Sequence, residues 1–240
     1  MDAADTYRAT ATRTLEEVLP DADWSQPAHA CPGWTVKDLV SHLVGLAEDV
    51  VTGNVAEYGS GPWTARQIER RSTEAPTATL LRWRELLDAI APMLRDPQAA
   101  GLPNYLPGLT VADALTHEHD LRQALDRPGA RDMAEVGDAL EKQLSRVSRL
   151  LSQAEQGIAV EFEDGVMSVL GADAAATRPP LTLKTTRFEL WRTMMGRRSL
   201  AQALALNWSG DASAVASLLV PFASNEPPRP IDWRTVDLVE

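Results

Sequence analysis

Two of the four histidines in this chain end nearly identical octets, TVKDLVSH at residues 35–42 and TVADALTH at residues 110–117. Each octet places an aspartate four residues before its histidine. Side chains four residues apart share one face of an α-helix, with Cβ atoms about 5–6 Å apart. Imidazole and carboxylate groups are common ligands of divalent metals. Each octet therefore predicts a helix that presents an Asp–His pair with metal-binding chemistry.

The first half of each octet has a structural explanation. Thr35 and Thr110 are candidate N-caps, and Asp38 and Asp113 stand three residues later, which is the spacing of a capping box. An acid in this position also meets the positive end of the helix dipole. Starting a helix is a sufficient role for Asp38, whereas a histidine seven residues after a cap takes no part in capping. The histidines are therefore the informative residues.

Two such helices packed in one bundle would bring the pairs together. Facing helices of a bundle build metal sites from a ligand on one helix and an i, i+4 pair on the other. His42 with Asp113 and His117 would supply two imidazoles and one carboxylate. Three protein ligands leave a fourth position for water or substrate, as in catalytic zinc sites. Zinc is the first expectation, and nickel, cobalt and iron accept the same ligands.

Other residues of the same chemical types have simpler interpretations. His119 follows His117 by two residues, so its side chain points about 160° away around the helix and outside the site. Asp120 falls near the face of His117 and is either a hydrogen-bond acceptor for that ring or a solvated charge. His29 is predicted to be a surface residue of a proline-rich loop, and Cys31 a small packing residue.

Composition limits the class of partner. The chain has 240 residues, a net charge of -11 and one cysteine. A negative chain is repelled by phosphate backbones and anionic membranes, so we expect no nucleic-acid or membrane partner. One cysteine excludes an internal disulfide and a cysteine-based zinc cluster. Without a signal-like start or a run of about 18 apolar residues, the chain is expected to be cytoplasmic.

The first part of the chain reads as helical. Apolar residues recur at helical spacing, and prolines and glycines separate the segments. The second motif opens the fourth of these helices. The predicted helices cover residues 3–19, 36–53, 64–94 with a break near 75–76, 111–125 and 131–154. We therefore expect a helical N-terminal domain over residues 1–154.

The character of the sequence changes after residue 154. GIAVEFEDG and VMSVLG read as two strands of a hairpin that turns at Asp164-Gly165, and LTLKTT as a third strand. Helical segments follow at 187–196, 200–208 and 212–222, the last of them capped by Asp211. The predicted fold class is α+β and mostly α, with a smaller α+β domain over residues 155–240.

The motifs also resemble those of a known family. CPGWTVKDLVSHL, followed later by DALTHEHDLRQAL, is similar to the mycothiol-dependent maleylpyruvate isomerase family, a branch of the DinB-like metal-binding four-helix bundles. FELWRTMMGRRSLAQALALNWSGD resembles the small C-terminal domain of the same family. The resemblance therefore extends over nearly the whole chain and implies a DinB-like bundle with a C-terminal α+β domain.

The resemblance implies the same ligands that geometry suggested. In that family a divalent metal, usually zinc, is held by a histidine nine residues after the glycine of a Gly-Trp-Thr motif and by an acid-x-x-x-His pair. His42 stands nine residues after Gly33, and Asp113 stands four before His117. The isomerases typically have glutamate where this chain has Asp113, whose side chain is one methylene shorter. Because Asp113 is also a predicted capping residue, a capping role and a ligand role compete there. An arginine of the C-terminal domain is implied to hold a substrate carboxylate, with Arg197 as the candidate and a solvated charge as its alternative.

The implied chemistry is that of a low-molecular-weight thiol. Mycothiol would bind the metal as thiolate and add to an electrophilic small molecule, as an isomerase or as an S-transferase. Two alternatives remain open: a metal-binding DinB-like protein without catalysis, in a stress or regulatory role, and a metal-dependent hydrolase. The sequence predicts neither the substrate nor the oligomeric state.

Overall fold

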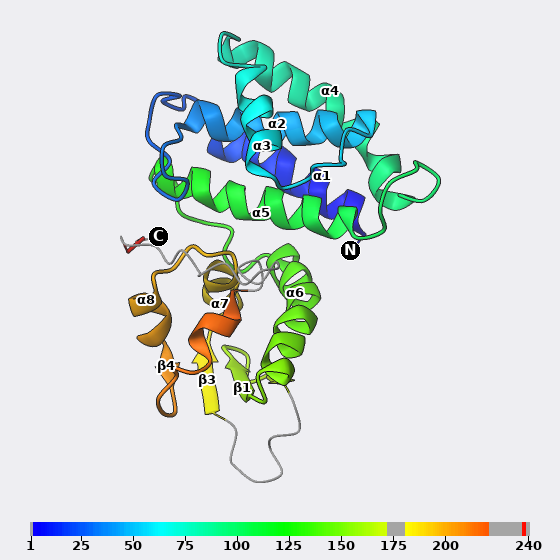
Figure 1. Cartoon of the computed structure of the whole chain (residues 1–240). Coiled ribbons are helices and arrows are strands. Elements are labelled where there is room, and N and C mark those ends of the chain that lie inside the picture. The colour runs from blue at the N-terminus through cyan, green and yellow to red at the C-terminus, as the bar shows by residue number, and fades with distance from the viewer. Residues whose placement is uncertain (1, 172–180, 221–236, 239–240) are drawn as a thin grey trace. The chain divides into compact units, whose positions relative to one another are not determined.

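A computed structural model describes residues 2–171, 181–220 and 237–238. The chain divides into two units, Met1–Gly129 and Ala130–Val239. The first unit is built from helices alone within its described residues (Figure 1). Its elements are α1 (Ala3–Arg13), the π-helical turn η1 (Thr14–Val18), α2 (Val36–Thr52), α3 (Gly61–Glu69), α4 (Pro76–Arg95) and α5 (Leu106–Ala124).

Four long helices make the core of the first unit. Helix α1 packs on α4 and α5, and α2 packs on α4 and α5, while the shorter α3 lies against α2. The inward faces are fully buried and apolar, as the helical spacing predicts. Their largest buried members include Leu39, Leu43, Leu46, Trp83, Leu86, Ile90, Leu106 and Leu115. This helical bundle is the expected N-terminal fold.

The first octet starts α2 as predicted. The side chain of Thr35 accepts from the backbone N–H of Asp38, and Asp38 accepts from the backbone N–H of Thr35 at 2.8 Å, so the capping box is complete. Gly53 ends the helix with a φ of 75°, a left-handed conformation that glycine adopts without a steric penalty. The predicted breaks on either side of α2 and between α3 and α4 are also present.

The second octet differs from the prediction, because α5 begins at Leu106 rather than Val111. Pro107 lies in the first turn, where its missing N–H costs no intrahelical hydrogen bond. Thr110 is therefore inside the helix, where its hydroxyl donates to the carbonyl oxygen of Leu106 at 2.9 Å. Asp113 is consequently released from the predicted capping role, and the competition between cap and ligand does not arise.

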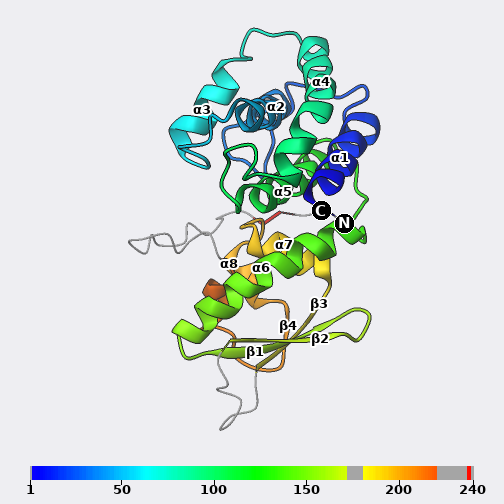
Figure 2. The ribbon, with the colours of Figure 1, turned by 90° about the vertical axis from the view of Figure 1, so that its right-hand side faces the viewer.

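The second unit combines helices with a four-stranded sheet (Figure 2). The strand order is β2-β1-β3-β4, with β1 antiparallel to β2, parallel to β3, and β3 antiparallel to β4. The predicted hairpin and third strand are present. The elements are α6 (Ala134–Gln153), β1 (Gly157–Phe162), β2 (Met167–Gly171), β3 (Leu181–Thr185), α7 (Arg187–Met194), α8 (Leu200–Leu204), β4 (Asn207–Trp208) and the 3-10 turn η3 (Ala216–Leu219).

The boundary between the units lies near residue 130, earlier than the expected 155. Helix α6 buries Val136, Leu140, Leu144, Val147 and Leu151, and it packs against β1, β2 and α7. It therefore completes the core of the second unit. Helical periodicity reveals an apolar face but not the domain that covers it, which explains the difference.

The last predicted helix, 212–222, is reduced to η3 in its described part, and residues 221–222 lie outside the described residues. Asp211 accepts from the backbone N–H of Ser213 at 2.9 Å, so it stabilises a turn instead of capping a helix.

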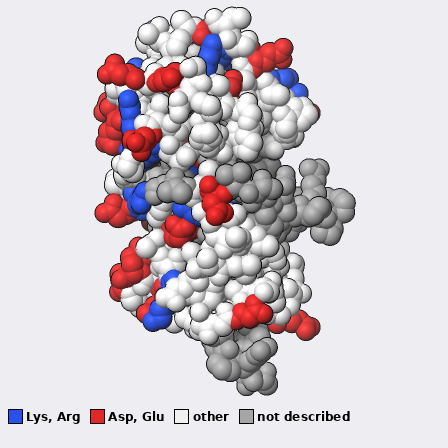
Figure 3. Space-filling view, turned by 90° about the vertical axis from the view of Figure 1, so that its left-hand side faces the viewer, with Lys and Arg blue, Asp and Glu red and all other residues white. Residues whose placement is uncertain are grey.

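No helix in the described ranges is long and apolar enough to span a membrane. The face in Figure 3 has acidic side chains interspersed with basic ones and shows no broad basic patch. The acidic side chains on this face agree with the net charge of -11.

Candidate metal centre

Helices α2 and α5 bring together the three predicted donors of the first unit. His42 Nε2 lies 3.3 Å from Asp113 Oδ2, and His117 Nε2 lies 3.6 Å from Asp113 Oδ1. The two imidazole rings meet edge to face with centroids 5.2 Å apart. Both histidines are buried, whereas the side chain of Asp113 is 26% exposed. Two imidazole nitrogens and a carboxylate therefore converge on one point, and the carboxylate belongs to a partly exposed side chain.

The spacing of these donors fits a divalent cation. Zinc–nitrogen and zinc–oxygen bonds of about 2.0–2.2 Å in a tetrahedron place neighbouring donors about 3.3–3.5 Å apart. All ligand atoms of the set lie within 4.8 Å of one another. Although aspartate is one methylene shorter than glutamate, the carboxylate of Asp113 lies close to both histidines, His117 one turn along α5 and His42 on α2. Ligation by His42, Asp113 and His117 stays a prediction, and the donor set is compatible with it.

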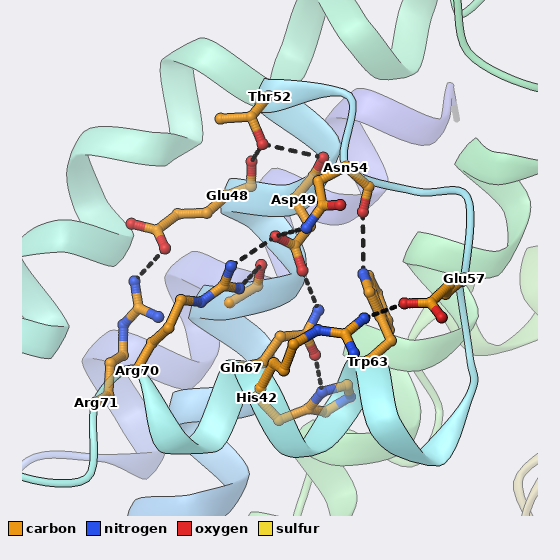
Figure 4. A network of polar contacts seen from close by, with 12 residues as sticks. His42, Glu48, Asp49, Thr52, Asn54, Glu57, Trp63, Gln67, Arg70 and Arg71 are labelled. Carbon is orange, nitrogen blue, oxygen red and sulfur yellow. Dashed lines mark hydrogen bonds and ion pairs between the residues drawn. The ribbon is translucent and has the colours of Figure 1, made fainter.

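Hydrogen bonds fix the orientation of His42 (Figure 4). Its Nδ1 lies 2.7 Å from Gln67 Oε1, and Gln67 Nε2 donates to Asp49 Oδ2 at 2.7 Å. Arg70 Nη1 donates to the other oxygen of Asp49 at 2.9 Å. Since an amide oxygen only accepts, Nδ1 of His42 must carry the proton. Nε2 is then the nitrogen with a lone pair, and it is the one that faces Asp113.

A glycine allows α3 to approach α2 closely enough for this contact. A Cβ atom built on Gly45 would lie 2.5 Å from Gln67 Cβ. Gly45 and Asp49 follow His42 by three and seven residues, so all three lie near one face of α2. In the sequence, the local signals of this arrangement are Gly45 and an aspartate, Asp49, on the same helix face. The sequence alone predicts no role for Gln67 or Asp49.

Replacing Gln67 by leucine is expected to weaken metal binding about 10- to 100-fold, the usual effect of losing a hydrogen bond to a ligating histidine. The side chains are similar in size, so the helical content should persist. Isothermal titration with Zn²⁺ and circular dichroism measure the two properties. The matched control is Gln98→Leu at an exposed position. Unchanged zinc affinity in Gln67→Leu would show that the amide does not orient His42.

A carboxylate has the same role for His117. Nδ1 of His117 lies 2.8 Å from Asp120 Oδ2, and Asp120 is completely buried. Of the two predicted interpretations of Asp120, the structure thus supports the hydrogen-bond acceptor and contradicts the solvated charge. Both rings therefore direct Nε2 towards Asp113. Nδ1 of His42 is hydrogen-bonded to a neutral amide, and Nδ1 of His117 to a carboxylate.

Cys31 lies beside this arrangement, contrary to the prediction of a simple packing residue. Its thiol donates to Asp120 Oδ2 at 3.5 Å, and Sγ lies 3.9 Å from His117 Nδ1. The turn before α2 sets this position, since Trp34 N donates to the carbonyl of Cys31 and Gly33 has a φ of 86°. Cys31 and His117 are 86 positions apart in the sequence, so no local pattern predicts the contact.

Aromatic side chains lie near the donors. The ring of Trp34 lies 5.5 Å from that of His42 and 6.3 Å from that of His117, measured between centroids. Burial raises the pKa of Tyr58, and the negative charge of Asp113 raises it further. Burial also raises the pKa of Tyr7, in spite of a hydrogen bond from Trp83. Both phenols therefore stay protonated and neutral at physiological pH.

The remaining candidates lie elsewhere. His29 is exposed, as predicted. His119 is buried, and it belongs to neither of the donor groups found in the described parts of the chain. Arg197 lies in the second unit, where its Nη1 donates to the carbonyl oxygen of Met195 at 2.7 Å. Its neighbour Arg198 is buried and pairs with Glu189. A role for Arg197 towards substrate stays a prediction.

The sequence was also compared with known proteins. Residues 8–122 match the family model described as the mycothiol maleylpyruvate isomerase N-terminal domain. The matched range begins in α1 and ends in α5, and it contains His42, Asp113 and His117. No curated protein and no solved structure matches the chain.

Proposed function

Because the N-terminal unit belongs to the mycothiol maleylpyruvate isomerase N-terminal domain family, we propose that this protein is a metal-dependent enzyme that uses mycothiol against an electrophilic small molecule. The observation that carries the proposal is the convergence of His42, Asp113 and His117, whose donor atoms all lie within 4.8 Å of one another. Isomerisation and S-transfer are the two reactions that this arrangement supports.

The charge of the donor set suits thiol chemistry. Two neutral imidazoles and one carboxylate leave a bound divalent cation with a net charge of +1. When bound, the cation lowers the pKa of a coordinated thiol and so supplies a thiolate at neutral pH. Gln67 and Asp120 hold the rings in place. Trp34 provides an apolar wall beside both rings.

The two reactions differ in the step after thiol addition. Addition to a conjugated double bond converts it to a single bond, about which rotation is free; loss of the thiol then gives the isomer. In a transferase the adduct is itself the product. Arg197 is proposed to bind a substrate carboxylate through its planar guanidinium. Substitution of this arginine should raise KM for acidic electrophiles more than for neutral ones.

An assay with purified, zinc-loaded protein tests the proposal. With mycothiol and a panel of unsaturated carbonyl compounds, including maleylpyruvate, we expect consumption of thiol or cis-trans conversion. His42→Ala should lower the rate by more than about 100-fold, because losing a metal ligand costs more than losing its hydrogen-bond partner. His29→Ala, at an exposed histidine, is the matched control.

Two outcomes would replace the proposal. Stoichiometric metal without turnover of any thiol would favour a metal-binding protein without catalysis. Hydrolysis of esters or amides in the absence of thiol would favour a metal-dependent hydrolase, in which a bound water is the nucleophile.

A further inference from the structure

A second group of donors lies on the opposite side of the His117 ring. It consists of Cys31 Sγ, His117 Nδ1 and Asp120 Oδ2, which all lie within 4.8 Å of one another. Asp120 and His117 are buried, and Cys31 is half-buried in the turn before α2. All three belong to the first unit. This group shares His117 with the metal centre described above but uses the other ring nitrogen.

The separations in this group are close to those that a tetrahedral cation requires. For zinc, with metal–sulfur bonds of about 2.3 Å and metal–nitrogen or metal–oxygen bonds of about 2.0–2.2 Å, sulfur lies about 3.5–3.7 Å from its neighbours. The thiol sulfur lies 3.5 Å from Asp120 Oδ2 and 3.9 Å from His117 Nδ1. The nitrogen and oxygen, now hydrogen-bonded at 2.8 Å, would have to separate by about 0.5–0.7 Å for zinc and by more for the larger Cd²⁺.

We propose that Cys31, His117 and Asp120 form a second cation site, selective for soft divalent cations such as Cd²⁺, and that it competes with the first site for His117. A thiolate ligand favours soft cations, whereas the first site offers only nitrogen and oxygen. When a cation binds, the thiol proton passes to solvent and the metal–sulfur bond forms.

The chemistry of the imidazole explains the competition. A neutral imidazole carries one proton and one in-plane lone pair, on different nitrogens. A cation in the first site takes Nε2 and leaves Nδ1–H to donate to Asp120. A cation in the second site takes Nδ1 and leaves Nε2–H facing Asp113. Each state thus has a carboxylate acceptor for the displaced N–H, and one neutral ring serves one cation at a time.

The proposal depends on the donors and not on catalysis. The cadmium titration therefore tests it independently of the proposed function. If both are correct, Cd²⁺ in the second site removes His117 from the first site and inhibits the enzyme in a way that Cys31→Ser relieves.

Titration of the metal-free, full-length protein with Cd²⁺ tests the site directly. Sulfur-to-cadmium charge-transfer absorption in the ultraviolet reports thiolate ligation. The His42→Ala variant loses a donor of the first site but keeps the second group intact, so it should give the full band with one equivalent. Asp120→Asn and His117→Ala should weaken the same binding at least tenfold, and Cys31→Ser should abolish the band.

The proposal is overturned if the His42→Ala variant gives no charge-transfer band. It is also overturned if Asp120→Asn and His117→Ala bind Cd²⁺ as tightly as the parent, since the thiol would then bind alone. Cys31→Ser is nearly isosteric, and Asp120→Asn retains the shape of the side chain, so these two variants decide the test if His117→Ala does not fold. Retention of one equivalent of Zn²⁺ while Cd²⁺ binds to sulfur would disprove the competition for His117.

Discussion

Replacing His42 or His117 by alanine is expected to lower the affinity for Zn²⁺ at the first site by more than about 100-fold, because in the proposed centre each substitution removes a direct ligand rather than a supporting hydrogen bond. His42 and His117 come from different helices, α2 and α5, and both direct Nε2 towards Asp113. When His42 is lost, the remaining donors, Asp113 and His117, both lie on α5 and cannot enclose a cation from two helices. The expected result is a protein that keeps its fold and does not retain zinc through dialysis.

The measurement is made in the Cys31→Ser background, so that sulfur ligation beside Asp120 does not replace the lost site. Bound zinc is determined by elemental analysis and its affinity by competition with a chromophoric chelator. His119→Ala is the internal control, since His119 lies on α5 two residues from His117 and outside both donor groups. It is buried, so it should lower the melting temperature and leave the zinc content unchanged. Full zinc content in both ligand variants would make the assignment wrong.

Asp113→Asn separates the carboxylate from the imidazoles. The amide keeps the shape of the side chain and removes its charge, so a site with Asp113 as ligand should bind zinc more weakly while the helix is undisturbed. The structure makes this comparison informative, because Asp113 lies well inside α5 and has no capping role to lose. A change in zinc affinity without a change in unfolding free energy would therefore identify ligation.

Local signals predicted the parts of the site that lie on one helix. The i, i+4 spacing of Asp113 and His117 and the capping box of Thr35 depend on residues close in sequence, and the structure contains both arrangements. The sequence predicts a start at Val111 instead of Leu106 because the octet TVADALTH has the Thr-x-x-Asp pattern of a capping box, and this pattern is the same at the start of a helix and inside one. Burial of Leu106 against the bundle extends the helix upstream, and this tertiary contact has no local pattern.

Residues that support the site from other elements could not be predicted in this way. Gln67 reaches His42 because Gly45 lets two helices approach, and Cys31 reaches His117 because a turn folds back over α5. Both contacts depend on how elements far apart in sequence pack. Helix α6 is predicted to belong to the N-terminal domain but lies in the second unit for the same reason, because an apolar helix face does not indicate which domain covers it. The spacing of residues within the octets thus predicts the donor set, and the packing of helices and loops determines which groups orient its side chains.

Replacing Glu118 by alanine is expected to lower the free energy of unfolding by about 3–5 kcal/mol, the cost of breaking a buried ion pair. Glu118 follows His117 on α5 and is completely buried. Arg13 of α1 donates to both of its oxygens, at 2.8 and 2.7 Å, and Arg122 Nε donates to Oε1 at 3.0 Å. Removing the carboxylate leaves two poorly solvated guanidinium groups without this countercharge.

Urea denaturation followed by circular dichroism measures the effect. The control is Asp88→Ala, which breaks the exposed pair of Arg8 with Asp88 and should cost less than about 1 kcal/mol. Equal losses in the two variants would show that the cluster around Glu118 is no more important than a surface pair. The difference in burial alone predicts a several-fold larger effect for Glu118.

A triple replacement separates stability from the geometry of the metal centre. Converting Arg13, Glu118 and Arg122 to methionine, leucine and methionine removes every charge of the buried cluster at once, and such exchanges are often neutral or stabilising. Glu118 joins α5 to α1 one residue after His117, and its hydrogen bonds with Arg13 are directional, whereas the apolar contacts that replace them are not. We therefore expect the triple variant to recover stability but to bind zinc more weakly than the parent. Parental zinc affinity in a stable triple variant would instead assign the cluster to stability alone.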